Sequence, residues 1–511
     1  MAHAKGWRSL LGLLALLPAL FVAFALFQGG HALWGVAFVS FVALTVFVYT
    51  ADRAYTYRYL LPSFAAFAVF VILPLIYTLY IAFTNYSATN MMSYGEVRAF
   101  LLRERDVNPN RPWLFTLHEV EQDEFALVLH AGRRGDDGAG DSYLSESFRP
   151  PVREKLTLAL HPGDAHERAT RELSLRETIA LRHALSNIEL LDPELGVPLR
   201  FYSFNSFVPS RRVWMEREED RGLLNLLTGE VLLPDFVSGH FRNEQGRAIG
   251  PGFRTRIGWD NFAQLFTNEA VRGPFLKIFA WTIVFAAFSV FLTFVVGFLL
   301  AVLLEWKPLR GRKVWRSLII LPYAVPAFIS ILIFRGLFNP QFGEINMVLH
   351  ALFGIRPDWT NHVLLARTMV LLVNLWLGYP YMMILCTGIL QSVPGDIYEA
   401  SAIDGCTPFS LLYRITLPLI LPPLRPLLVA SFAFNFNNFL LIQLLTGGGP
   451  RIPDAATAVG YTDILVTYTF NLAFRDSGAN FGFAAAIATI IFIIITILSY
   501  ANLRAAARNS R

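Results

Sequence analysis

Long apolar runs alternate with short polar segments along most of this chain. Eight runs approach or exceed the ~20 residues that a helix needs to cross a bilayer core. They lie at about 10–28, 33–50, 60–84, 275–304, 315–337, 368–390, 424–446 and 481–503. The pattern predicts an all-α polytopic membrane protein with eight transmembrane helices.

The first run is similar to the core of a secretory signal peptide, because Lys5 and Arg8 precede it. It is longer than such cores, it lacks a clear small-residue cleavage site, and a second apolar run follows it directly. We therefore expect the N-terminal helix to stay attached as the first span.

Residues 85–274 have a different character. Two segments show the alternation of half-buried strands: Phe125, Leu127 and Leu129 in one, and Leu156, Leu158 and Leu160 in the other. A third segment has helical spacing, at Leu181, Leu185 and Ile188. We expect a mainly β extracytoplasmic insert domain. The predicted domains are three N-terminal spans in 1–84, the insert in 85–274, and a core of five spans in 275–511.

Charge gives the orientation. The short loops placed on one side carry 14 Lys and Arg, against five on the other, so both termini are expected in the cytoplasm and the insert on the opposite side of the membrane. Residues 85–275 hold 28 acidic and 23 basic side chains, so the excess behind the net charge of +5 belongs to the spans and their loops. It reflects topology and does not indicate nucleic-acid binding.

Few residues offer catalytic chemistry. No Gly-Lys dipeptide occurs, which excludes a phosphate-binding P-loop, and no Asp or Glu lies well inside a span, which disfavours ion-coupled transport. His161 and His166 fit a solvated loop better than a metal site, and Cys386 and Cys406 form no ligand set. We expect no enzyme activity, no metal and no cofactor in this chain.

One cytoplasmic stretch, EASAIDGCTPFSLLYRITLP, predicts two short helices. Pro394 opens the first and Gly405 ends it, Thr407 with Pro408 starts the second, and Pro418 is expected to end it. A helix pair exposed between membrane spans suggests a docking partner.

This stretch resembles the EAA loop of ABC importer membrane subunits, EAA-x3-G-x9-I-x-LP. The matching residues are Glu399, Ala400, Ser401, Gly405, Ile415, Leu417 and Pro418, with serine in place of the third alanine. The resemblance implies that the loop docks into a separate ATPase subunit, which binds ATP and Mg²⁺, and that Gly405 permits the bend between its helices.

A polar stripe marks the seventh predicted span. Ser431, Phe434, Asn435, Asn438 and Ile442 fall at helical offsets 0, 3, 4, 7 and 11, which predicts one shared face. Amides exchange hydrogen bonds with hydroxyls and a ring covers the apolar face of a pyranose, which favours a sugar site. Interhelical hydrogen bonds explain the same pattern equally well.

Further segments resemble the MalF-type permease family of maltose/maltodextrin ABC importers: GWDNFAQLF, LPYAVPAFISILIF, LGYPYMMILC, SFAFNFNNFLLIQLLTGGGP and FGFAAAIATIIF. The resemblance implies a type I ABC importer permease fold and a mid-membrane maltodextrin site made of Tyr323, Leu377, Gly378, Tyr381, Ser431, Phe434, Asn435 and Asn438. Ala327 stands where relatives usually have serine. Pro322, Pro326 and Pro380 should kink their helices near the site.

The same resemblance implies the partners: a MalG-type permease, a homodimeric MalK-type ATPase, and a periplasmic maltose-binding protein held by the insert. Another oligosaccharide remains an alternative substrate. A sugar phosphate is disfavoured because no Arg or Lys lies mid-span. A membrane sensor would not explain eight spans with an EAA loop, and an anchored enzyme would need a catalytic cluster.

Overall fold

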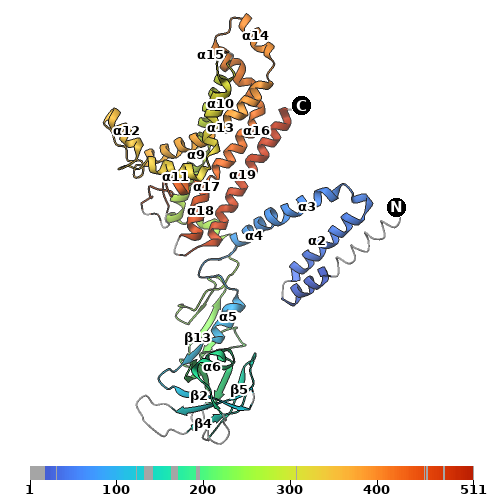
Figure 1. Cartoon of the computed structure of the whole chain (residues 1–511), viewed down its shortest axis with the longest axis vertical. Coiled ribbons are helices and arrows are strands. Elements are labelled where there is room, and N and C mark those ends of the chain that lie inside the picture. The colour runs from blue at the N-terminus through green and yellow to red at the C-terminus, as the bar shows by residue number, and fades with distance from the viewer. Residues whose placement is uncertain are drawn as a thin grey trace. The chain divides into compact units, whose positions relative to one another are not determined.

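The structure is a computed structural model that describes residues 18–29, 32–121, 123–131, 142–162, 171–191, 196–306, 308–453, 455, 459–475 and 478–509. Its contacts divide the chain into two compact units, Met1–Ala88 with Arg256–Arg511, and Thr89–Thr255. The first unit is helical and the second is built mainly from strands (Figure 1). Lys5, Arg8, His166 and residues 10–17 lie outside the described part.

The helical unit contains the apolar segments. Its helices are α2 (Ala32–Thr50), α3 (Tyr57–Phe67), α4 (Leu73–Ala82), α8 (Asp260–Thr267), α9 (Glu269–Glu305), α10 (Arg312–Ala324), α11 (Ala327–Leu337), α12 (Glu344–Phe353), α13 (Val363–Ser392), α14 (Gly395–Ile403), α15 (Pro408–Ser410), α16 (Leu417–Phe436), α17 (Phe439–Leu445), α18 (Leu465–Phe474) and α19 (Phe481–Asn509). A 3-10 helix, η1 (Asp52–Ala54), and two π-helical segments, η2 (Ala68–Ile72) and η4 (Leu411–Thr416), join some of them.

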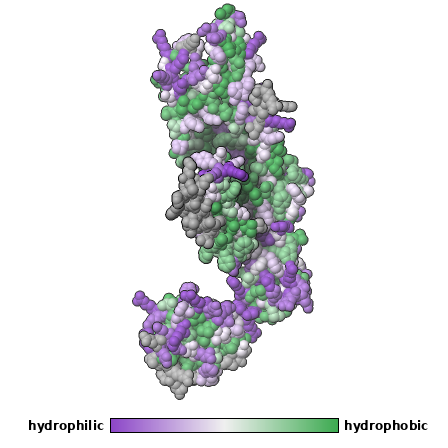
Figure 2. All heavy atoms as spheres, turned by 90° about the vertical axis from the view of Figure 1, so that its right-hand side faces the viewer, coloured by the Kyte–Doolittle hydropathy of each residue, from purple (hydrophilic) through white to green (hydrophobic). Residues whose placement is uncertain are grey.

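Five helices in the described residues are long and apolar enough to cross a membrane, and a bent pair can supply a sixth span. The five are Tyr57–Ala82, Glu269–Glu305, Val363–Ser392, Pro408–Phe436 and Phe481–Asn502. Shorter apolar helices at Pro18–Gln28 and Trp34–Thr50 lie within the first two predicted spans. The polytopic helical fold predicted from the sequence is confirmed, and Figure 2 shows hydrophobic residues over much of the visible surface of this unit.

The bent pair is the predicted fifth span. Helices α10 and α11 meet at 87° across a break between Ala324 and Ala327, with Pro322 in the last turn of α10 and Pro326 capping α11. Proline lacks an N–H and restricts the residue before it, so the two rings end one helix and start the next. Pro380 behaves differently, because it lies inside the uninterrupted helix α13.

Helices α9 and α13 form a close pair in the bundle. A Cβ atom added at Gly297 of α9 would lie 2.7 Å from Met382 Cβ of α13, and one added at Gly378 of α13 would lie 2.8 Å from Thr293 Cγ2 of α9. Small residues let two membrane helices approach until their backbones nearly touch. A larger residue at either glycine would push this pair apart.

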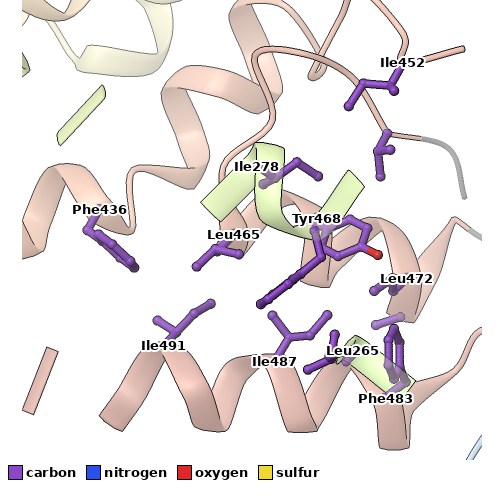
Figure 3. Close-up of a cluster of buried hydrophobic side chains, with 14 of the residues drawn as sticks. Leu265, Ile278, Phe436, Ile452, Leu465, Tyr468, Leu472, Phe483, Ile487 and Ile491 are labelled. Carbon is purple, nitrogen blue, oxygen red and sulfur yellow. The ribbon is translucent and has the colours of Figure 1, made fainter. Parts of the chain in front are cut away.

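A second packing centre joins α8, α9, α16, α18 and α19. Leu265, Tyr468 and Ile487 are fully buried there, and Figure 3 shows their side chains converging with those of neighbouring helices. Asn261 of α8 also donates to the carbonyls of Ala82 and Thr84 at 2.8 and 2.9 Å. These hydrogen bonds fix the end of the α4 span against the core helices.

The insert contains two antiparallel-rich sheets. Its strands are β1 (Arg105–Val107), β2 (Trp113–Glu121), β3 (Glu124–Ala131), β4 (Ser142–Ser145), β5 (Leu156–Leu158), β6 (Leu160–Pro162), β7 (Arg171–Glu172), β8 (Ile188–Leu191), β9 (Pro198–Ser203), β10 (Ser206–Arg212), β11 (Trp214–Glu216), β12 (Leu223–Asn225), β13 (Val231–Asp235), β14 (His240–Arg242) and β15 (Ala248–Ile249). The order of the larger sheet is β5-β8-β9-β10-β2-β3-β4-β6, with β1 on β10 and β7 on β2, and the smaller runs from β11 to β15.

Each sheet has its own core. Trp113, Leu127 and Phe207 are buried in the larger one, and Trp214 and Phe253 in the smaller one, beside helix α5 (Tyr94–Arg103). The mainly β insert predicted from the sequence is confirmed.

The helical spacing expected at Leu181, Leu185 and Ile188 was only partly right. Short helices α6 (Leu175–Ala180) and α7 (Arg182–Ser186) end before Ile188, which starts strand β8 and is fully buried. Pairing with β5 and β9 overrides the local spacing there.

Candidate functional site

The stretch that resembles the EAA loop, residues 399–418, is called the coupling loop below, and it forms two helices at one end of the bundle (Figure 1). Helix α14 starts after Pro394, and Glu399 and Ala400 are exposed on it. Ser401, the departure from the family pattern, is buried, and its Oγ donates to the Ile397 carbonyl at 2.6 Å. The hydroxyl is thus satisfied within its own helix, so a small residue is retained at this position without an unpaired polar group.

Gly405 makes the turn between the two helices. Its φ of 71° is in the left-handed region that favours glycine. The Thr407 side chain then accepts from the Ser410 N–H at 3.3 Å, with Pro408 in the first turn, as expected for a helix start. The bend predicted at Gly405 is confirmed.

The end predicted at Pro418 is wrong. The helix runs from Pro408 to Phe436, and the π-helical segment η4 lies just before Pro418, where the Leu417 N–H donates to the Leu412 carbonyl. Pro418 falls in the first turn of α16, and the wider turn before it accommodates the proline ring. Ile415 and Leu417 are half-buried, and Pro418 is exposed.

One residue near this loop escaped the sequence analysis. Glu305, at the end of α9, accepts from Arg316 of α10 at 2.8 Å and from Gln391 of α13 at 2.9 Å. It thereby joins three helix ends directly before the coupling loop. A lone acidic residue at the end of an apolar run, with a basic residue soon after it, is the signal that could have identified it.

The predicted polar stripe is interrupted. Helix α16 ends at Phe436, and Asn438 instead caps α17, where its Oδ1 accepts from the Leu441 N–H at 3.4 Å. The single helical face expected for Ser431 through Ile442 is therefore wrong beyond Phe436. Two consecutive asparagines compete with the helix for backbone hydrogen bonds, which favours a break at this point.

The structure nevertheless brings the two predicted amides together through a third. Asn374 Nδ2 of α13 donates to Asn435 Oδ1 at 2.8 Å, and Asn438 Nδ2 donates to Asn374 Oδ1 at 3.2 Å. Asn435 Nδ2 also donates to the Ser431 carbonyl at 2.9 Å. We call Asn374, Asn435 and Asn438 the carboxamide cluster. Asn374 was not selected from the sequence, although it is a single amide in an apolar run.

The other predicted site residues lie on three helices. Tyr323 lies on α10, Leu377, Gly378 and Tyr381 on α13, and Phe434 on α16. Tyr323 and Phe434 are 56% and 70% exposed within this chain. Within the described residues, no hydrogen bond joins either tyrosine to the carboxamide cluster. The rings of Tyr323 and Phe434 are therefore accessible to another molecule.

A buried carboxylate lies outside the membrane-spanning helices. Asp463, between α17 and α18, is 1% exposed and accepts from the Gly460 N–H at 2.8 Å and the Thr467 hydroxyl at 2.7 Å. Burial raises the pKa of Asp463 to about 6, against the lowering effect of both hydrogen bonds. In the described part of the chain, no group of three or more His, Cys, Asp or Glu is placed to hold a metal.

Two family models match this chain. The binding-protein-dependent transport system inner membrane component matches residues 293–509, and the maltose transport system permease protein MalF P2 domain matches residues 92–258. The two matches fall on the helical core and on the β insert.

Curated relatives match over nearly the whole length. The maltose/maltodextrin transport system permease protein MalF of Escherichia coli (strain K12) is 43% identical over 99% of this chain and 97% of its own. That of Vibrio parahaemolyticus serotype O3:K6 (strain RIMD 2210633) is 41% identical over 97% of this chain and 94% of its own. A solved bacterial ABC transporter involved in alginate import has a TM-score of 0.43 and 22% identity over 50% of this chain and 85% of that chain. The full-length identity and the two family matches show that the chain belongs to the MalF family of maltose/maltodextrin transport system permeases.

Proposed function

We propose that this chain is the membrane subunit through which an ATP-driven importer carries maltose and maltodextrins across the bacterial inner membrane. The observation that supports it most directly is the carboxamide cluster, where three amides from three helices meet inside a bundle of a family of maltose permeases. Buried amides are costly in a membrane unless they are paired, and a sugar presents the hydroxyls that pair with them.

The amides retain capacity for a ligand. Each side-chain amide has two N–H donors and an oxygen with two lone pairs, and the hydrogen bonds at Asn435 and Asn438 leave part of that capacity unused. Ser431 adds a hydroxyl one turn away. The exposed rings of Tyr323, Tyr381 and Phe434, with Leu377 and Gly378, would cover the apolar faces of the sugar rings.

The chain would form half of the pathway. Its partners would be a MalG-type permease and a homodimeric MalK-type ATPase, which supplies the ATP chemistry, and a maltose-binding protein would dock on the insert. Glu399 and Ala400 are exposed on α14, where an ATPase groove could receive them. With this loop in the cytoplasm, both termini are cytoplasmic and the insert is periplasmic.

Reconstitution tests the proposal. The chain is assembled with the three partners in proteoliposomes, with ATP on the ATPase side and radiolabelled maltose with its binding protein on the other. We expect maltose accumulation that requires both ATP and the binding protein. Sucrose and lactose are the matched competitors. Transport of either in preference to maltose and maltotriose would contradict the assigned substrate.

A further inference from the structure

One face of the larger sheet of the insert carries several arginine side chains. Arg105 of β1 lies opposite Arg212 of β10, and Arg200 of β9 lies opposite Val208 of β10. Side chains two residues apart on a strand point to the same face, so Val208, Ser210 and Arg212 share one. The register therefore places three arginines and Ser210 on one side of the sheet.

A cavity of about 410 Å³ is lined by Arg105, Arg200, Ser210 and Arg212, together with Glu189 and Leu226. Glu189 is already engaged, because its Oε1 forms an ion pair with Arg200 Nε at 3.2 Å and accepts from Lys155 Nζ at 3.5 Å. Among the residues that the structure describes, neither Arg105 nor Arg212 has a carboxylate partner. Within the described residues, the lining of the cavity therefore carries more positive than negative charge.

Two polar atoms at this cavity are buried and lack an acceptor or donor. Within the described ranges, Arg105 Nε and Ser210 Oγ have no hydrogen-bond partner, and Ser210 is 2% exposed. Burial lowers the pKa of Arg105, and the nearby charges of Arg212 and Arg200 lower it further, against the opposing effect of Glu189. A buried donor without an acceptor is uncommon in folded domains, because it loses its hydration without compensation.

We infer that this cavity binds a small oxyanion, a carboxylate or a phosphate, through Arg105, Arg212 and the Ser210 hydroxyl. Guanidinium groups present paired N–H donors that match the oxygen spacing of both anions. The volume is in the range of small-molecule pockets. An anion here would neutralise the arginines and accept from Arg105 Nε. The inference concerns the insert alone and does not depend on which sugar the chain transports.

Calorimetry on the detergent-purified full chain tests the site. Inorganic phosphate and succinate are titrated separately at low ionic strength, with chloride as the only other anion. We expect saturable binding of at least one of them at one site per chain. Arg105→Gln together with Arg212→Gln should weaken it by at least tenfold. Ser210→Ala, which removes a single donor, should weaken it by about 2-fold to 12-fold.

The matched control is Arg176→Gln, which removes an exposed arginine of the same unit on α6 and should leave binding unchanged. Arg212→Gln alone serves if the double variant fails to fold, because Arg212 is at the exposed end of β10. No saturable binding of either anion would overturn the site. So would equal affinity in the parent chain and in Arg212→Gln, or equal loss in the control.

Discussion

Asn374 Nδ2 on α13 donates a hydrogen bond to Asn435 Oδ1 on α16 at 2.8 Å. The two residues are 5% and 7% exposed, so the hydrogen bond is shielded from water. This interaction combines both interpretations of the polar stripe, because the amides connect helices in this structure and keep further donors for a ligand. The two roles separate only when transport and stability are measured on the same variants.

Replacing Asn435 or Asn438 with alanine should weaken sugar binding by about 1–3 kcal/mol, or roughly 5-fold to 150-fold in affinity, because sugar hydroxyls would lose partners in a desolvated site. Sugar uptake in proteoliposomes should fall most. Hydrolysis stimulated by loaded binding protein should survive better, since that signal enters through the insert and outer loops.

The control for these variants is Thr387→Val on α13, whose buried hydroxyl has no partner among the described residues. It removes a polar group at nearly constant volume from α13, the helix that carries Asn374, so uptake and complex yield should stay normal. A parallel loss of uptake, hydrolysis and complex yield in the asparagine variants would mean that the amides act only as helix contacts.

Gly405→Pro and Glu399→Lys should interrupt the contact through which this chain stimulates its ATPase. Proline cannot adopt the φ of 71° at Gly405, and lysine reverses the charge at an exposed position of α14. We expect normal membrane levels and a loss of sugar-dependent ATP hydrolysis in proteoliposomes. Gly388→Ala is the matched control, because its added Cβ would meet no atom within 4 Å. Coupled hydrolysis at the parental rate in both loop variants would refute the role of this loop.

Deleting about residues 95–255 with a short linker should leave the spans able to assemble. The insert has its own cores, and its chain enters and leaves at neighbouring points, since the Gly252 N–H donates to the Thr89 carbonyl at 2.9 Å. Affinity of the resting transporter for the binding protein should fall, as measured by pull-down. Unchanged affinity for the binding protein would contradict a role of the insert in docking it.

Asp463→Asn should flatten part of the pH dependence of stability. The pKa of Asp463 is about 6 in the folded chain and near 3.8 in the unfolded one, so the folded state holds this proton more tightly. Its contribution to stability is full below the unfolded pKa and is lost as pH rises through the folded value. Thermal unfolding at about pH 4.5 and about pH 7.5 should therefore show a smaller loss on raising pH in the variant than in the parent. An equal loss of stability in the parent and in the variant would contradict the raised pKa of Asp463.

The hydrophobic pattern predicted the helical unit because several of its apolar runs are long enough to cross a bilayer. In β3 of the insert, Leu127 and Leu129 are fully buried, but Ala126 and Val128 are buried as well, so this strand is covered on both faces. The break at Pro322 and Pro326 was also predictable, since proline acts locally. Ile188 was misassigned because it pairs with Leu156 of β5, which lies much earlier in the chain.

The site was less accessible to sequence reasoning. Helical offsets placed Asn435 and Asn438 on one face, but a break at Asn437 moved Asn438 to the start of another helix. Their common partner Asn374 lies more than 60 residues earlier in the chain, so no local pattern connects them. Tertiary packing between α13 and α16 decides this contact.

The π-helical segment Leu411–Thr416 accommodates an extra residue within one continuous helix. Each residue of an α-helix turns the chain by about 100°, and a wider turn holds one residue more than an α-turn would. Removing one residue from this segment would therefore restore an ordinary α-turn and leave Asn435 facing nearly the same way relative to Gly405. Removing one residue from the α-helical part of the same helix would instead turn Asn435 by about 100°.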